Sequence, residues 1–235
     1  MAGFEPVSTA DANVPSPSAL RLVLAAERLF ATHGIDGVSL RQIAAEAGSG
    51  NNSAVHYHFG TKHGLIAAIF RYRLPQIISE RRLLAARCDP GELRSRFEAH
   101  FLPVLTMADA TDNHYVSFVD QIQRTDLATV GDLLDLPAEG LHSNEEFRRD
   151  LHRLLEHLPE PLRDLRINEA QSLCIHAAAD RERAVASGAD VVPFDLFANA
   201  LVDAMAGFLA APASAATVRR LRDTGEVGAG RLRLL

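Results

Sequence analysis

The fold is decided by residues 26–66, which read AERLFATHGIDGVSLRQIAAEAGSGNNSAVHYHFGTKHGLI. Three short segments with helical character begin near Ser18. Each of them ends at a turn, and these turns contain Gly34, Gly48 and Gly60 in order. Three short helices within about fifty residues, with a tight polar turn before the third, are typical of a helix-turn-helix unit. Small three-helix units also occur as plain packing modules, so this pattern alone leaves both interpretations open.

Hydroxyl side chains mark the expected starts of several helices. Ser39 and Gln42 have the spacing of a capping box, in which each side chain bonds a backbone N–H of the other residue. Thr61 follows a glycine break and is placed to cap the long helix after it. Ser143 and Glu146 repeat the capping-box spacing, which predicts a further helix start.

The rest of the chain is also expected to be helical. No run of residues alternates with a period of two, so the chain is predicted to be all-α. Pro75 is expected to kink the first long helix, because proline removes a backbone hydrogen bond and clashes with the preceding turn. The expected helices after the first three span 63–87, 90–108, 114–126, 144–158, 161–187, 193–211 and 214–223.

Composition excludes several classes of protein. The chain has 235 residues, of which 47% are hydrophobic, so it can bury a sizeable core. Its net charge of −6 argues against a protein that coats nucleic acid with its whole surface. Two cysteines, Cys88 and Cys174, are too few for a disulfide framework or a zinc site. Neither a signal peptide nor a membrane-spanning stretch is expected, and a cytoplasmic location is the default.

The residue pattern of this stretch is specific. It runs Ala26…Leu29-Phe30…Gly34, then Ser39…Ile43-Ala44…Ala47-Gly48, then His56-Tyr57-His58-Phe59-Gly60-Thr61-Lys62. In this pattern the chain resembles the TetR family of bacterial transcriptional regulators, over about one fifth of its length. The resemblance implies an all-α fold, with an N-terminal three-helix helix-turn-helix DNA-binding domain and a C-terminal helical ligand-binding and dimerisation domain. Three departures from the family pattern are a turn one residue longer before the third helix, His56 at a position often aromatic, and His63-Gly64 after the lysine.

The resemblance and the composition together divide the chain into four parts. The N-terminal part contains three prolines without periodicity, and the last residues are rich in glycine. The expected parts are a flexible N-terminal arm at 1–17, the helix-turn-helix DNA-binding domain at 18–64, the helical ligand-binding and dimerisation domain at 65–224, and a loose C-terminal tail at 225–235.

Base contacts are expected at the N-terminal end of the third helix, which enters the major groove in this kind of domain. Asn51, Asn52 and Ser53 lie there, and asparagine pairs with adenine through two hydrogen bonds. Turn formation and helix capping are the alternative roles of the two asparagines. His56 is a further candidate for a thymine methyl or a guanine edge.

Phosphate contacts are expected on both sides of these residues. The family pattern implies them for Tyr57 and His58, although His58 has the alternative of packing against the neighbouring Phe59 and the first helix. Lys62, the only lysine of the chain, begins the fourth helix, where free amides also attract phosphate. Arg41 matches a position that contacts a base or a phosphate in some family members. The alternative is a solvated surface arginine. The complete set of expected DNA-binding residues is Ser39, Arg41, Asn51, Asn52, Ser53, His56, Tyr57, His58 and Lys62.

The resemblance also implies a small-molecule effector. Bulky residues of the middle helices are candidates to line its pocket, and packing in an ordinary core is the alternative for each of them. Because most of these bulky residues are apolar, they favour a hydrophobic effector. The expected ligand-binding residues are Phe97, Phe101, Met107, Tyr115, Phe118, Phe147 and His176.

A homodimer on a palindromic double-stranded DNA operator is expected from the same resemblance. The helix at 193–211 is apolar around much of its circumference and needs cover on more than one side. The expected dimerisation residues are Phe194, Phe197, Leu201, Met205 and Phe208. In contrast, the charge run at 180–183 is interpreted as solvated or interfacial.

The predicted function is therefore a ligand-responsive transcriptional regulator, and repression is the expected mode because it is the most common one in the family. An all-α enzyme and a helical interaction module without DNA binding are the alternatives. No glycine-rich phosphate loop, nucleophile elbow or HExxH motif is present, so no catalytic residue and no cofactor are expected. The histidines at 56, 58 and 63 do not share one helix face, so no metal site is expected.

Charge divides along the same boundary as the expected domains. Residues 18–73 hold six basic and three acidic residues, which gives a net charge of +3. From residue 74 onward 18 basic residues stand against 25 acidic ones, which gives −7. The first region is only mildly basic, so few ionic contacts with phosphate are expected, each adding about 0.9 to the slope of the salt dependence.

Overall fold

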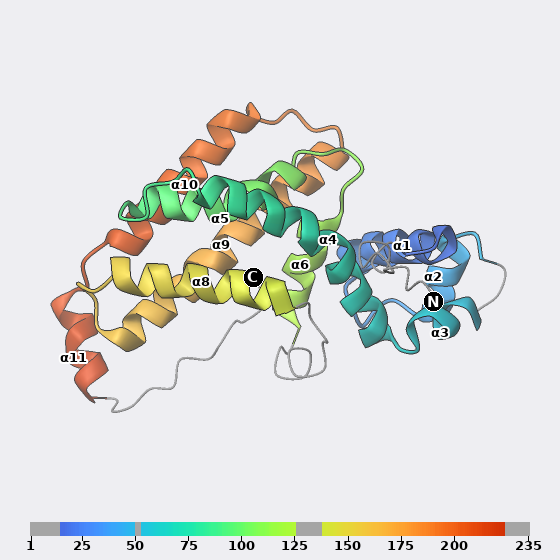
Figure 1. Ribbon diagram of the computed structural model, residues 1–235, viewed down its shortest axis with the longest axis horizontal. Helices are drawn as coiled ribbons and strands as arrows, with labels where there is room; N and C mark the ends of the chain where they lie inside the picture. The colour runs from blue at the N-terminus through green and yellow to red at the C-terminus, as the bar shows by residue number, and fades with distance from the viewer. Residues whose placement is uncertain (1–14, 50–52, 126–137, 224–235) are drawn as a thin grey trace, which may run out of the picture.

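The computed structural model describes residues 15–49, 53–125 and 138–223, and these residues confirm the all-α prediction. Figure 1 shows α1, α2 and α3 gathered at one end of the molecule, the remaining helices at the other, and α4 between them. The helices are α1 (Pro17–His33), α2 (Leu40–Glu46), α3 (Ser53–Phe59), α4 (Lys62–Ala85), α5 (Leu93–Met107), α6 (Tyr115–Arg124), α8 (Ala138–Leu154), α9 (Glu160–Ala186), α10 (Phe194–Ala210) and α11 (Ala215–Asp223).

The predicted boundaries of the first two helices are confirmed. The Ser16 hydroxyl accepts a hydrogen bond from the backbone N–H of Ala19 and begins α1. Gly34 ends α1 with a φ of 75°, a left-handed conformation that favours glycine. The capping box that begins α2 is present in full, because Ser39 and Gln42 each bond the backbone N–H of the other.

Helix α4 joins the two ends of the molecule. Thr61 caps it as expected, since its hydroxyl accepts a hydrogen bond from the Gly64 N–H. Pro75 lies inside the helix, which continues through it from Lys62 to Ala85. The N-terminal half of α4 packs its apolar side chains under α1 and α3, and its C-terminal half packs on α5 and α8. One helix is therefore shared by both ends of the molecule.

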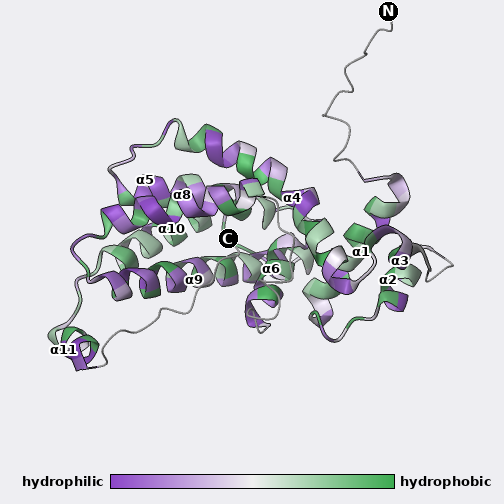
Figure 2. Cartoon of the chain, turned by 60° about the horizontal axis from the view of Figure 1, so that its bottom comes forward, coloured by the Kyte–Doolittle hydropathy of each residue, from purple (hydrophilic) through white to green (hydrophobic). Residues whose placement is uncertain are grey.

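Helix α6 is the second connection between the ends, because it packs against both α1 and α9. A single apolar core connects the described helices from α1 to α10, and Phe30 of α1 stacks on Phe118 of α6. In Figure 2 α9 alternates between hydrophilic and hydrophobic residues along its length, as a helix half-covered by its neighbours does. A movement of α6 relative to α9 would therefore also change the contacts between α6 and α1.

One predicted helix start is wrong. Ser143 does not begin a helix, because α8 already begins at Ala138 and runs through Ser143 to Leu154. Residues three apart lie on one face within any helix, so the capping-box spacing of Ser143 and Glu146 is equally compatible with an interior position.

Among the described residues no single helix is long and apolar enough to cross a membrane. Helices α10 and α11 reach that length and composition only as a pair, with a bend of 60° between them.

Candidate nucleic-acid interface

Helix α3 turns three consecutive aromatic side chains toward solvent. Val55 is buried under α1 and α4, which fixes the orientation of the helix. His56, Tyr57 and His58 are then exposed, and the Tyr57 side chain is 85% exposed. A tyrosine this exposed contributes little to packing and is available to a partner.

The two histidines beside Tyr57 are held by the protein itself. The Nδ1 atom of His56 lies 2.9 Å from the Gly60 carbonyl oxygen, and because a carbonyl only accepts, this nitrogen is the donor. His58 Nε2 lies 3.5 Å from the Ser18 hydroxyl of α1, and its ring contacts those of Tyr57 and Phe59. The expected packing of His58 against Phe59 and α1 is therefore present, while its side chain stays exposed.

Lys62 connects the start of α4 to the turn that follows α1. Its Nζ donates a hydrogen bond of 2.9 Å to the backbone carbonyl of Ile35, and the side chain is half-buried. The turn between α3 and α4 is tight, because a Cβ at Gly64 would overlap the Phe59 carbonyl oxygen. A glycine at position 64 thus has a steric reason.

The N-terminal end of α2 presents Ser39 and Arg41 at the surface. The Ser39 hydroxyl donates to Gln42 Oε1 at 2.7 Å in addition to its capping role. The Arg41 side chain is exposed, whereas Arg28 of α1 forms an ion pair with Glu46 at the other end of α2. The ion pair between Arg28 and Glu46 joins α2 to α1.

Some expected contacts lie outside the described residues. Of the expected DNA-binding residues, Asn51 and Asn52 lie there. Residues 1–14 of the expected arm and residues 224–235, which include the expected tail, also lie outside the described residues. Ser53 is the first residue of α3. The structure brings the other expected DNA-binding residues together on α2, α3 and the start of α4.

Comparisons with known proteins find matches to the N-terminal end of the molecule, which contains α1, α2 and α3. Residues 22–69 match the family model described as bacterial regulatory proteins, tetR family. The chain is 32% identical over 81 residues to the HTH-type transcriptional repressor AcnR of Corynebacterium glutamicum. Residues 22–69 form a TetR-family domain. That match spans 33% of this chain and 43% of AcnR, which is less than half the length of this relative.

One solved structure extends the likeness of fold to most of the chain. The fatty acid degradation regulator FadR of Bacillus halodurans superposes with a TM-score of 0.54 at 12% identity, over 84% of this chain and 97% of that one. The TetR-family regulator PfmR of Thermus thermophilus has a TM-score of 0.46 at 20% identity, over 75% and 96%.

The residues expected to line an effector pocket lie mainly in the core of the protein. Their rings pack against one another, with 4.5 Å between the centroids of Phe97 and Phe101. Within the described residues the Tyr115 hydroxyl and the Nε2 of His100 are buried without a hydrogen-bond partner. Met107 is partly buried at the end of α5. The fully buried members of the expected set are Phe97, Phe101, Tyr115, Phe118 and Phe147.

His176, the remaining member of that set, lies elsewhere. It is half-exposed on α9, where its Nδ1 is 3.2 Å from Asp120 Oδ1 and 3.0 Å from Arg124 Nη2. It therefore belongs to a polar cluster between α6 and α9 and not to the aromatic core.

The residues expected to form a dimer interface pack against the body of their own chain. The Arg181 guanidinium lies over the rings of Phe194 and Phe197, at 5.7 and 4.8 Å from their centroids. The outer face of α10 carries Leu196, which is 59% exposed, and several small residues. It also carries the exposed Asn199 and Asp203, both of which accept hydrogen bonds from Arg94 of α5. The inward-facing members of the expected set are Phe194, Phe197, Leu201, Met205 and Phe208, all buried or partly buried.

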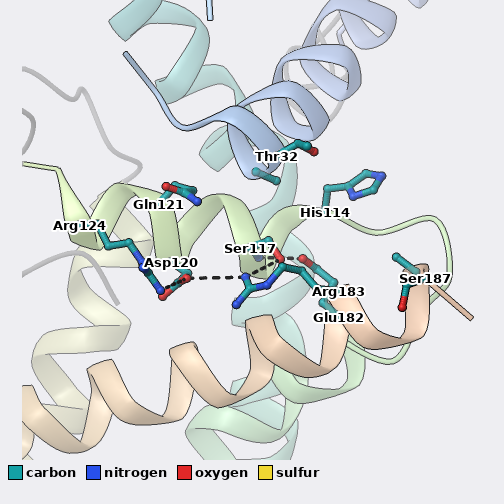
Figure 3. A pocket seen from close by; sticks show the side chains of 11 residues that line it. Thr32, His114, Ser117, Asp120, Gln121, Arg124, Glu182, Arg183 and Ser187 are labelled. Carbon is teal, nitrogen blue, oxygen red and sulfur yellow. Dashed lines mark hydrogen bonds and ion pairs between the residues drawn. The ribbon is translucent and has the colours of Figure 1, made fainter. Parts of the chain in front are cut away.

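A polar cavity lies where α1, α6 and α9 meet, and sequence reasoning missed it. Its volume is about 590 Å³, and it lies between the end of α1 and the facing sides of α6 and α9 (Figure 3). The sequence predicts a solvated or interfacial charge run at 180–183, but Arg181 and Glu182 are buried. The available signal was that both follow the buried apolar stripe of α9 in helical register.

Glu182 holds the N-terminus of α6 from across this cavity. Its carboxylate accepts hydrogen bonds from the backbone N–H groups of Val116 at 3.1 Å and Ser117 at 2.7 Å. The residue that precedes α6, His114, supplies no side-chain cap of its own. Burial raises the pKa of Glu182 to about 7, while the hydrogen bonds from residues 116 and 117 oppose that rise. This contact ties α9 to the helix that supports α1.

Proposed function

We propose that this protein is a dimeric transcriptional regulator that binds a palindromic DNA operator and releases it when a small molecule binds. The observation that carries the proposal is the exposed face of α3, formed by His56, Tyr57 and His58, in a domain that matches the TetR family over residues 22–69. The proposed role is therefore that of a cytoplasmic DNA-binding protein and not of an enzyme. Repression is proposed because the relative AcnR is described as a repressor.

We propose different roles at the DNA for the residues of this face. Residues at the start of α3 are proposed to contact base edges, while Tyr57 and Lys62 contact phosphates. Lys62 retains further N–H donors after its bond to Ile35, because an ammonium group has three. Phosphate contacts fix the register of the protein on the duplex, and base contacts supply specificity.

Dimerisation is proposed through the outer face of α10. Leu196, Ala200, Ala204 and Gly207 recur there at helical spacing and are exposed in the single chain. A Cβ added to Gly207 would meet no atom within 4 Å, so another helix can approach closely at this position. A two-fold partner would cover this face and place two α3 helices on one side of the duplex, about 34–36 Å apart for successive major grooves.

Control by a small molecule is proposed to act through α4 and α6. Both helices pack on α1, so a ligand that prefers another arrangement of the body also prefers another position of α3. The ligand changes DNA affinity only by the difference between its affinities for the two arrangements.

The test is selection of binding sites from a random pool of double-stranded DNA, followed by a gel-shift titration of the enriched sequence. The proposal predicts an enriched palindrome that is bound specifically and more weakly as salt increases. Failure to enrich any sequence, or equal affinity for enriched and scrambled duplexes, contradicts it.

A further inference from the structure

The polar cavity between α1, α6 and α9 has the composition of a site for a polar molecule. Nine of its eleven lining residues have polar or charged side chains, the exceptions being Ala31 and Ala186. Its volume of about 590 Å³ falls within the range of small-molecule sites, which is about 300–1,000 Å³. Figure 3 shows side chains from all three helices around this space.

The acidic groups of the cavity are already engaged by the protein. Both carboxylate oxygens of Glu182 accept backbone N–H groups of α6. Asp120, whose side chain is only 4% exposed, lies 3.0 Å from the guanidinium of Arg124, 3.7 Å from that of Arg183 and 3.2 Å from His176. The Asp120 carboxylate thus interacts with three basic side chains.

The basic groups of the cavity keep hydrogen-bonding capacity. The side chain of Arg124 is 55% exposed and that of Arg183 is 43% exposed. Arg183 also contacts Asp180 and the Ser117 hydroxyl. A guanidinium has five N–H donors in a planar fork, more than these contacts use. The cavity therefore presents two accessible guanidinium groups around an acidic group that is already surrounded.

We propose that this cavity is the effector site and that it binds a small polar carboxylic acid. A carboxylate matches the planar fork of arginine, which binds it through two parallel hydrogen bonds. Gln121, Thr32 and Ser187 line the rest of the space and supply partners for hydroxyl or amino groups of the ligand. This chemistry differs from the hydrophobic effector that the aromatic middle helices suggested.

The position of the cavity explains how its ligand would act on DNA binding, and this part rests on the proposed function. Thr32 lies in the last turn of α1, next to the Gly34 cap, and Gln121 of α6 faces that same end. The other wall comes from α9 in the body of the protein. A molecule that bonds Arg183 and Thr32 together bridges the body and the first helix of the DNA-binding domain, so it favours one orientation of α3.

The test uses isothermal titration calorimetry on the full-length protein with succinate, malate and glutamate as probes, at fixed ionic strength. Sulfate is titrated as a simple anion and glycerol as an uncharged polyol. The variants are R124Q and R183Q. R153Q is the matched control, because Arg153 is similarly exposed and pairs with Asp150 three residues earlier, as Arg183 pairs with Asp180, but lies outside the cavity.

The expected result is that at least one of the three acids binds the wild-type protein and R153Q with equal affinity. R124Q and R183Q then bind it about 10- to 100-fold more weakly, the loss expected when a charge-assisted hydrogen bond is removed. Thermal melting of each variant without ligand checks that the fold is retained. The proposal is wrong if none of the acids binds with a Kd below about 1 mM, if sulfate binds as well as they do, or if R124Q and R183Q bind like the wild type.

A gel shift with the selected duplex separates this outcome from the proposed function. Acid binding that depends on Arg124 and Arg183, in a protein without specific DNA binding, keeps the site and contradicts the regulator. Specific DNA binding that no acid changes, together with failed calorimetry, keeps the regulator and overturns the site.

Discussion

Glu27 and Arg73 form a bidentate ion pair that joins α1 to α4. The Nε and Nη2 atoms of Arg73 donate to the two carboxylate oxygens of Glu27 at 2.7 and 2.6 Å. Glu27 is 1% exposed, so its charge has been taken out of water. Burial lowers the pKa of Arg73, but the hydrogen bond to Glu27 and the charge of Glu27, with smaller contributions from Tyr72 and Tyr115, together outweigh this effect, so the net shift is upward. This pair fixes the DNA-binding domain on the long helix that leads to the body.

Breaking this pair on one side is expected to destabilise the protein strongly. In R73M the Glu27 carboxylate stays buried without its partner, and the free energy of unfolding should fall by about 3–5 kcal/mol. Urea unfolding followed by circular dichroism measures the change. The E27L/R73M double variant removes both charges and should regain most of the loss. A loss in R73M below about 1 kcal/mol, typical of a surface ion pair, would show that the pair is not effectively buried.

Lys62 is expected to serve both the fold and the DNA. In K62M the bond to the Ile35 carbonyl is lost, so the free energy of unfolding should fall by about 1.5–3 kcal/mol. If Nζ also contacts a phosphate, the slope of log affinity against log salt becomes shallower by about 0.9. Fluorescence anisotropy over a salt series measures this slope, with R87Q as a control outside the DNA-binding domain. An unchanged slope would leave Lys62 with the structural role alone.

Glu182 is expected to make stability depend on pH. Burial raises its pKa to about 7 from the ordinary 4.5, so the folded protein holds this proton more tightly than the unfolded chain. The resulting stabilisation is fully present below pH 4.5 and is lost as the pH rises through 7. Measured against E182Q, which does not titrate at this position, the free energy of unfolding of the wild type should decline by on the order of 3 kcal/mol across this range.

Urea titrations at several pH values give both curves. Parallel curves for the wild type and E182Q would contradict the shifted pKa, and a relative gain of wild-type stability with rising pH would show that the hydrogen bonds to α6 outweigh burial.

The outer face of α10 is expected to hold the dimer together. Ala204 is exposed there, and in A204E a charge would be buried between the two copies. Analytical ultracentrifugation should show a dimer for the wild type and a monomer for A204E at equal concentration, with unchanged helical content. E169Q, at an exposed position of α9, is the control for a charge change. A dimer of undiminished affinity in A204E would place the interface elsewhere.

Local signals in the sequence predicted local structure well. The glycine at 34, the capping box of Ser39 and Gln42, and the cap at Thr61 all lie at the expected positions, because each depends on only a few neighbouring residues. The helix start predicted from the second capping box was wrong, because this spacing also depends on only a few neighbouring residues. The spacing of Ser143 and Glu146 carries no information on whether a helix has already begun.

Contacts between distant segments were harder to anticipate. The polar cavity needs Thr32, Arg124 and Arg183 together, and these residues are separated by tens of positions in the sequence. On α10 the larger apolar residues drew attention, but they pack on the chain's own body because burying them there removes the most apolar surface. The face left exposed carries Ala200, Ala204 and Gly207 among polar residues, and such small side chains have little hydrophobic signal.

The affinity of Y57A for the selected operator duplex tests whether the exposed face of α3 binds DNA. Tyr57 is 85% exposed on α3, so its loss should leave the melting temperature unchanged. L83A, which removes another exposed side chain far along α4, serves as the control. Fluorescence anisotropy should show Y57A binding about 10-fold or more weakly than the wild type and L83A, as expected for a lost phosphate contact. Equal affinity of Y57A and the wild type for that duplex would contradict the assignment of this face of α3 to DNA.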